Sequence, residues 1–195
     1  DNFGSLIRPQ VGNVADVLAT LEAQDMAGNL FLAETHQRVL RVLRMAEALS
    51  QRYAVVVANP PYMGGKGMNP RLSAWLKENY EPVKTDLFSA FVVRNLELAL
   101  PKGQLGFMTP FVWMFISSYE KLRAILIDQK TITSLIQLEY SGFDGATVPI
   151  CTFTVENAHK PDFRGGYVRL SDFRGADQQG PRALEIIQAA RKVGK

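Results

Sequence analysis

The sequence is poor in the residues that build metal centres and disulfides. It has a single cysteine, Cys151, and only two histidines, His36 and His159. One cysteine excludes an internal disulfide and a cysteine-rich zinc site. Two histidines leave little material for a histidine-based metal site or a Ser-His-Asp triad. A lone thiol fits a reducing compartment, so we predict a cytoplasmic protein without a bound metal.

Long apolar runs and an excess of one charge are also missing. No stretch approaches the 18 apolar residues of a membrane-spanning helix, so no membrane partner is expected. The chain starts without an initiator Met or a basic-then-apolar signal pattern, and we expect it to be part of a longer protein. There are 22 Lys and Arg against 19 Asp and Glu, a net charge of +3. This balance permits an anionic partner without requiring one.

Apolar periodicity predicts alternating strands and helices. A helical lead-in covers 14–26 and 30–49, with a break at Gly28-Asn29. A β-branched run at 53–58 is typical of a strand buried on both faces. Further strands are expected at 105–109, 132–139 and 148–155, and helices at 71–79, 86–100, 119–129 and 181–192. The last two strands are expected to pair antiparallel, and the whole pattern predicts a three-layer α/β fold.

The segment Asn59-Pro60-Pro61-Tyr62 directly follows the first predicted strand. Ligands of α/β sheets bind at the carboxyl ends of strands, so this segment is the first candidate site. Two consecutive prolines have no N–H and a fixed φ, which leaves nearby carbonyls as free acceptors in a stiff frame. Asn59 adds a side-chain carbonyl, and Tyr62 adds a flat ring. Together they suit a planar group that carries an amine.

The sequence resembles a known enzyme family at this point. Val55-Val56-Val57-Ala58-Asn59-Pro60-Pro61-Tyr62 is similar to the catalytic motif of DNA methyltransferases that form N6-methyladenine from S-adenosylmethionine. Three more segments resemble later motifs of that family in the same order: Asp86 to Phe91, Gly103 to Pro110, and Phe143 to Thr152. The helical lead-in and the loop Met63-Gly64-Gly65-Lys66-Gly67 resemble the PglX-type methyltransferases of BREX phage defence.

The resemblance implies a fold, a cofactor and a mechanism. The fold would be the later strands of a Rossmann-like class I methyltransferase sheet, with flanking helices. Asn59 and the Pro60 carbonyl would accept hydrogen bonds from the adenine amine, with Pro61 stiffening the loop. The base would be flipped out of double-stranded DNA, and Tyr62 and Phe143 would stack on it. No metal is implied, and other defence-system proteins are possible partners.

Three further residues have weaker roles by the same resemblance. Asp86 and Phe91 would contact the cofactor, although Asp86 could simply cap a helix and Phe91 could be a core residue. Lys66 would contact a DNA phosphate, against the alternative of a solvated glycine loop.

The predicted organisation has three parts. Residues 1–51 form a helical lead-in, 52–158 form the C-terminal half of a methyltransferase core, and 159–195 connect to a recognition domain. No glycine-rich cofactor loop occurs before residue 58, so we expect this piece alone to be inactive.

Two alternatives to DNA methylation stay open. The same four-residue motif serves methyltransferases that act on protein glutamine or on RNA. A non-catalytic DNA-binding module of the same fold is the other alternative.

Overall fold

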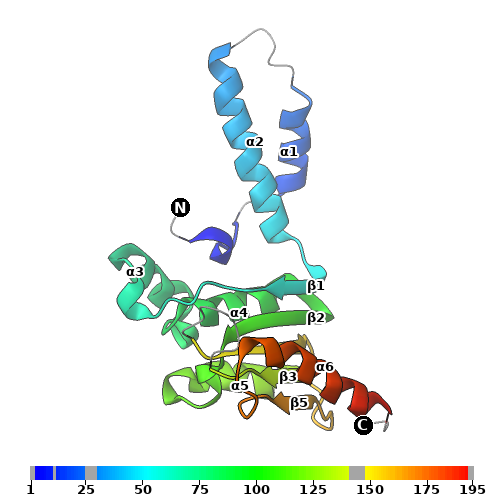
Figure 1. Cartoon of the computed structure of the whole chain (residues 1–195). Coiled ribbons are helices and arrows are strands. Elements are labelled where there is room, and N and C mark those ends of the chain that lie inside the picture. Colours follow the sequence, from blue (N-terminus) through cyan, green and yellow to red (C-terminus); the bar gives the residue numbers. More distant parts are fainter. Residues whose placement is uncertain (1–2, 11, 25–29, 141–147, 193–195) are drawn as a thin grey trace. The chain divides into compact units, whose positions relative to one another are not determined.

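The chain divides into two compact units, residues 1–52 and residues 53–195. The structure is a computed structural model that describes residues 3–10, 12–24, 30–140 and 148–192. The first unit is helical, and the second is a mixed sheet with helices on its faces (Figure 1). In the described residues, no helix combines the length and apolar character needed to cross a membrane.

The first unit contains the two helices that the periodicity predicts, while its role as a lead-in stays a prediction. Helix α1 (Val14–Glu22) is followed by helix α2 (Leu30–Ser50). The two helices are joined by polar contacts: His36 Nε2 donates to the Leu21 carbonyl at 2.8 Å, and Arg44 pairs with Glu22 at 2.8 Å. The predicted break at Gly28-Asn29 lies outside the described residues.

The second unit is built on a five-stranded sheet. Its strands are β1 (Tyr53–Ala58), β2 (Ala99–Pro110), β3 (Thr131–Gln137), β4 (Ile150–Glu156) and β5 (Gly166–Arg169). They lie in the order β1-β2-β4-β3-β5. β4 alone runs against the others, which confirms the predicted antiparallel pairing of β3 with β4. The carboxyl ends of the four co-directional strands therefore meet at one edge of the sheet.

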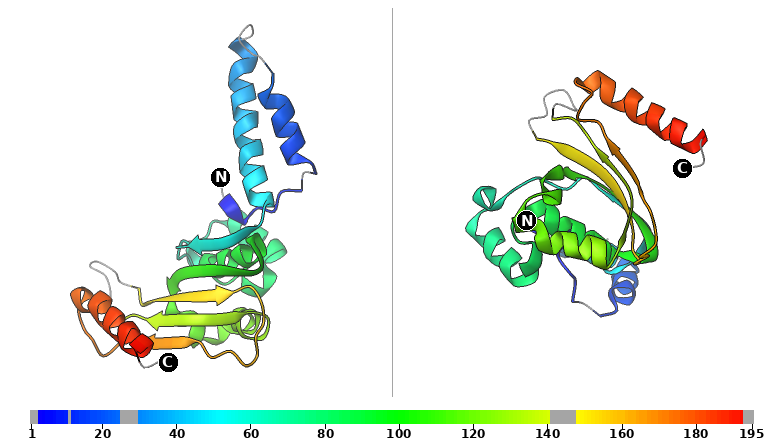
Figure 2. Two further views of the ribbon diagram at one scale, coloured as in Figure 1. Left: turned by 90° about the vertical axis from the view of Figure 1, so that its right-hand side faces the viewer. Right: turned by 90° about the horizontal axis from the view of Figure 1, so that it is seen from below.

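Helices cover both faces of this sheet, so the predicted three-layer α/β fold is confirmed. α4 (Leu87–Leu98) and α5 (Glu120–Asp128) lie on one side and α6 (Ala176–Lys192) on the other (Figure 2, right). Helix α3 (Pro70–Asn79) begins at its cap, Asn69, whose Oδ1 accepts from Leu72 N at 2.9 Å. The main core contains the rings of Phe107, Phe153 and Trp113, with Phe153 centred 5.1 Å from each of the other two.

The expectation that the first strand is buried on both faces is wrong in this chain. Val55 is 61% exposed and Val57 is 78% exposed. β1 is an edge strand, and these two side chains face away from the side that α4 covers, in register with Gln104 and Gly106 of β2. A β-branched run reports strand propensity, but it does not report whether a neighbour covers the strand.

The segment Pro101-Lys102-Gly103 does not separate the fourth helix from the second strand as predicted. α4 ends at Leu98, and β2 starts at once with Ala99 and includes these three residues. Lys102 has a left-handed φ of 64°. A Cβ on Gly103 would lie 2.8 Å from the Leu100 carbonyl oxygen and 3.1 Å from that of Ala54, so only glycine fits there.

Asn157, which directly follows β4, forms hydrogen bonds to the junction between α4 and β2. Its Nδ2 amide is shared among the carbonyls of Leu96, Ala99 and Leu100 at 3.0–3.1 Å. Its backbone N–H donates to the Gly103 carbonyl at 2.8 Å. One side chain thereby satisfies carbonyls that the end of α4 leaves without helical partners.

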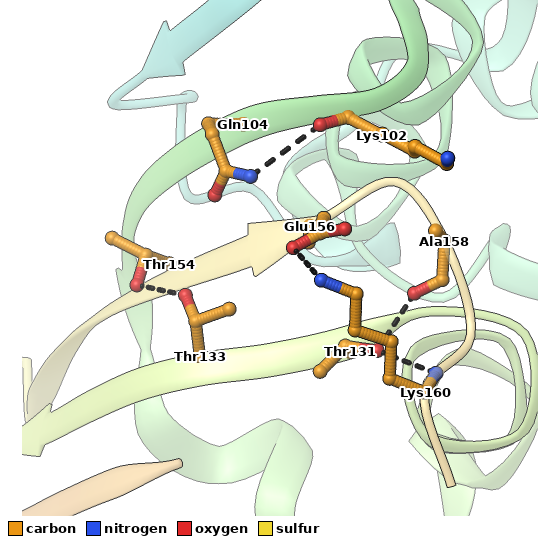
Figure 3. Close-up of polar contacts among 8 residues, drawn as sticks. All are labelled: Lys102, Gln104, Thr131, Thr133, Thr154, Glu156, Ala158 and Lys160. Carbon is orange, nitrogen blue, oxygen red and sulfur yellow. Dashed lines mark hydrogen bonds and ion pairs between the residues drawn. The ribbon is translucent and has the colours of Figure 1, made fainter. Parts of the chain in front are cut away.

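Polar contacts also join the strands at the other end of the sheet, where the co-directional strands begin (Figure 3). Thr131 Oγ1 donates to the Ala158 carbonyl at 2.7 Å and accepts from Lys160 N at 2.9 Å. Lys160 Nζ pairs with Glu156 at 2.7 Å. These bonds tie the turn after β4 to the start of β3.

The tail contains more regular structure than the sequence predicts. β5 adds to the sheet beside β3, although no strand was expected there. α6 begins at Ala176, five residues before Pro181, where the helix was expected to start. Gln179, 3% exposed, holds this early turn because its Oε1 accepts from Glu139 N at 2.9 Å and its Nε2 donates to the Phe173 carbonyl. The role of 159–195 as a connector stays a prediction.

We predict that Asn157→Ala lowers the free energy of unfolding by about 1–3 kcal/mol, because it leaves several carbonyls of the α4–β2 junction without a donor. Urea unfolding followed by circular dichroism measures this. Gln129→Ala, at an exposed position that follows α5, is the matched control and should change stability little. Equal stability of the two variants would contradict the role given to Asn157.

Candidate active site

The segment Asn59-Pro60-Pro61-Tyr62 leaves the carboxyl end of β1, as the sequence predicts. Asn59 is exposed, Pro60 is buried and Tyr62 is half-buried. No described residue donates a hydrogen bond to the Pro60 carbonyl. The loop therefore presents backbone and side-chain acceptors from a frame that the two prolines stiffen.

Tyr62 connects this loop to the neighbouring strand β2. Its hydroxyl lies 3.0 Å from Asn59 Oδ1 and 3.3 Å from the Met108 carbonyl oxygen, and it donates to these acceptors. Its ring packs against a small apolar cluster at the carboxyl edge of the sheet, the Leu138 cluster, which consists of Leu138, Ile150 and Leu170. Because a carbonyl oxygen has two lone pairs, Asn59 Oδ1 keeps one for a further donor.

Two ionisable groups at the loop, the Tyr62 hydroxyl and the Cys151 thiol, have pKa values above their ordinary ones. Burial, and then the nearby Cys151 thiol, raise the pKa of Tyr62 above its ordinary value. Burial also raises the pKa of the Cys151 thiol, which contacts Thr109 Oγ1 at 3.7 Å. Both groups therefore stay protonated at neutral pH, and the Tyr62 hydroxyl acts as a hydrogen-bond donor.

Asp86 holds the other end of the loop. Its Oδ1 accepts from Phe88 N at 3.2 Å, which caps α4, and from Met63 N at 3.1 Å. Leu87 N donates back to the Met63 carbonyl at 2.9 Å. Asp86 thus caps a helix, which was the simpler of its two predicted roles, and it also fixes the residue that follows Tyr62. Its contact with a cofactor stays a prediction.

The structure also gives positions for two other predicted site residues, Phe91 and Lys66. Phe91 lies on α4 and is half-buried. Lys66 is exposed in the short turn Gly65–Gly67. Phe143 lies outside the described residues. In the part of the chain that the structure describes, no three His, Cys, Asp or Glu side chains gather as a metal site would need.

Sequence reasoning missed Met108 and Tyr119. Met108 is part of a motif quoted for its strand, but only the register of β1 on β2 places its carbonyl at Tyr62. Tyr119 stacks near Phe88, with ring centroids 5.5 Å apart. Burial, with the charge of Asp86, raises the pKa of Tyr119 to about 12. No local pattern marks either residue.

We predict that Asp86→Ala destabilises the protein by about 1–2 kcal/mol, as loss of a helix cap does, and frees the loop at Met63. Asp86→Asn keeps a side-chain oxygen that can accept the same two bonds, so it should retain most of this stability. Chemical unfolding gives the free energies, and amide exchange at Met63 reports on the loop. An Asn variant as unstable as the Ala variant would show that the charge, rather than the acceptor, matters.

The pH dependence of stability provides a separate prediction. Burial raises the pKa of Asp86 above its ordinary value of 3.8, with bonds from Phe88, Met63 and Leu87 opposing this. The folded state then holds this proton more tightly than the unfolded state, so the contribution of Asp86 to stability falls as pH rises from 3.8 through the raised pKa. Asp86→Asn does not titrate, so the wild type should lose stability relative to it across that window. A difference in unfolding free energy between the wild type and Asp86→Asn that does not change with pH would contradict the raised pKa of Asp86.

Relatives of this chain are found among methyltransferases. It is 34% identical over 176 residues to the adenine-specific methyltransferase BrxX of Escherichia coli O9:H4 (strain HS), covering 87% of this chain and 15% of that protein. It is 30% identical over 176 residues to the adenine-specific methyltransferase PglX of Lacticaseibacillus casei (strain Zhang), covering 88% and 15%. The chain therefore spans about 15% of the length of these curated relatives.

Solved structures agree on the fold. The chain matches the DrdV–DNA complex with a TM-score of 0.57 at 14% identity, over 72% of this chain and 17% of that one. It matches a putative class I S-adenosylmethionine-dependent methyltransferase from Listeria monocytogenes with a TM-score of 0.51 at 18% identity, over 70% and 42%. The fold is thus that of class I methyltransferases. A family model described as Eco57I restriction-modification methylase matches residues 18–143. The chain belongs to the Eco57I restriction-modification methylase family.

Proposed function

We propose that this chain is the catalytic segment of a DNA methyltransferase that transfers a methyl group from S-adenosylmethionine to adenine N6. One observation carries the proposal: the end of β1 offers Asn59 Oδ1 and the Pro60 carbonyl as neighbouring acceptors. An exocyclic amine has two N–H bonds and needs two such acceptors. The family and the names of the relatives support adenine as the base.

The chemistry required of these acceptors is electrostatic and orientational. The lone pair of the adenine amine is delocalised into the ring, which makes the nitrogen a poor nucleophile. Hydrogen bonds to Asn59 and Pro60 draw the nitrogen toward a tetrahedral geometry and localise that pair. Tyr62 holds Asn59 with its hydroxyl and supplies a ring face for the flipped base, and Phe143 is proposed as a second aromatic contact.

The fold and family support S-adenosylmethionine as the cofactor. S-adenosylmethionine supplies the methyl group when bound. Phe91 lies on α4 and is only half-buried, which supports its proposed contact with the adenine moiety of the cofactor. Asp86 would act mainly by holding the loop, because its Oδ1 is already used by Met63 and Phe88.

The DNA partner and the biological setting belong to the same proposal. Lys66 is exposed in the glycine-rich turn that follows the site, where a phosphate contact is open to it. We place the enzyme in restriction-modification or BREX-type phage defence, and its action there with other defence proteins. We propose that the activity requires the longer protein, because this chain spans only about 15% of its relatives.

We predict that Asn59→Ala in the full-length protein lowers methylation of adenine N6 by on the order of a hundredfold or more, as loss of a key transition-state hydrogen bond does. Single-molecule sequencing of host DNA measures it and identifies the recognition site. Asn79→Ala, at an exposed position in α3, is the matched control and should methylate normally.

The same experiment separates the alternatives. Absence of adenine methylation with intact, folded protein and its partners would overturn the DNA methyltransferase proposal. Methylation of protein glutamine or of RNA would then be tested, and finally DNA binding without catalysis.

A further inference from the structure

A cavity of about 1090 Å³ lies between helix α6 and the sheet. Its sheet side is formed by Met108, Thr152, Ile136 and Leu138, and Gln179 and Ala183 are among its residues on α6. The cavity adjoins the candidate active site, because the carbonyl of Met108 accepts from Tyr62, and Met108 packs with Tyr62 on the Leu138 cluster.

The register of the strands lines this cavity up with Asn59. Ala58, the last residue of β1, pairs with Phe107 of β2, and the Tyr62 hydroxyl bonds both Asn59 Oδ1 and the Met108 carbonyl. We therefore continue the register by one residue and set Asn59 beside Met108. Met108 pairs in turn with Thr152 of β4. Paired residues point to the same face of a sheet, so these three form one row on the face that α6 covers. Thr152 is two strands from Asn59, about 10 Å between Cα atoms at a strand spacing of about 4.8 Å.

Thr152 is the polar side chain that β4 contributes to the cavity wall. Its side chain is half-buried, and its hydroxyl makes no hydrogen bond with another described residue. Thr154, two residues along the same strand, differs: its Oγ1 lies 2.7 Å from both Thr133 Oγ1 and Ser134 Oγ. A hydroxyl in the cavity wall that is not engaged by a neighbouring described residue can both donate to and accept from a ligand there.

We propose that Thr152 is a specificity-determining residue that hydrogen-bonds a ring nitrogen of the same purine whose amine Asn59 holds. This inference rests on the proposed function. A hydroxyl both donates and accepts, and the distance from Asn59 to Thr152 suits a purine with a hydrogen bond at each end. The Met108 side chain lies between them, and its thioether offers a soft, apolar surface under the ring.

Helix α6 closes the opposite side of this cavity. Gln179 ties its first turn to the end of β3, and Ala183 and Ile186 pack against the Leu138 cluster. Ala183, with its small side chain, lines the same cavity as Thr152. α6 lies beyond residues 18–143, which the family model matches.

The test uses the full-length protein and duplexes that carry adenine, 1-deazaadenine, 3-deazaadenine or 7-deazaadenine at its mapped target position. We expect Thr152→Val to lower kcat/KM for adenine roughly five- to tenfold, the effect of one hydrogen bond. One deaza base should cause the same loss with the wild type and no further loss with Thr152→Val. Fluorescence of 2-aminopurine at the target position should show weaker base insertion by this variant.

Thr154→Val is the matched control, since it removes a hydroxyl from the same strand and face, away from the cavity. It should show no coupling to any deaza base, and unfolding experiments on both variants exclude a general loss of structure. The role of Thr152 would be overturned if Thr152→Val lowered kcat/KM by the same factor with adenine and with each of the three deaza bases. It would also be overturned if Thr152→Val and Thr154→Val behaved alike. Neither result would affect the proposal of adenine methylation. Absence of methylation by the wild type would overturn the proposed function together with this inference.

Discussion

The parallel pairing of β1 with β2 is the constraint on which the site depends. It places Ala58 beside Phe107, and the residue that follows, Asn59, beside Met108. A shift by one residue would turn Asn59 to the face that carries α4 and would separate Tyr62 from the Met108 carbonyl. Gly103 permits the close approach of the two strands, because any side chain there would meet backbone carbonyls of both. The catalytic chemistry proposed for the loop therefore begins with backbone geometry several residues earlier.

The loop is then held at both ends by groups that do not react. At one end Tyr62 bonds to Asn59 and to β2, and at the other Asp86 bonds to Met63 and caps α4. Between them the prolines fix φ. Such a frame needs little reorganisation when a planar substrate arrives, which is how preorganised acceptors contribute to catalysis.

The sequence was sufficient for the first four strands and their connecting helices, the three-layer fold and the position of the loop after a strand. Periodicity and the two prolines carry that information locally. It was insufficient where contacts with residues distant in the sequence determine the burial of a side chain or the start of a helix. Val55 and Val57 are exposed because β1 is an edge strand, and α6 starts early because Gln179 bonds to Glu139 forty residues away. Likewise, Met108 and Thr152 fall within quoted motif segments, but only the pairing of the strands shows that one lies beside Tyr62 and that both line the cavity.

The exposed edge of β1 has a consequence for work with this protein. Its outer side presents backbone donors and acceptors beside the bare apolar side chains of Val55 and Val57. Natural sheets protect such edges with charges, bulges or covering elements, because an unprotected edge is a template for pairing with another chain. We therefore expect this strand to be the first place where isolated copies of the sheet unit pair with one another.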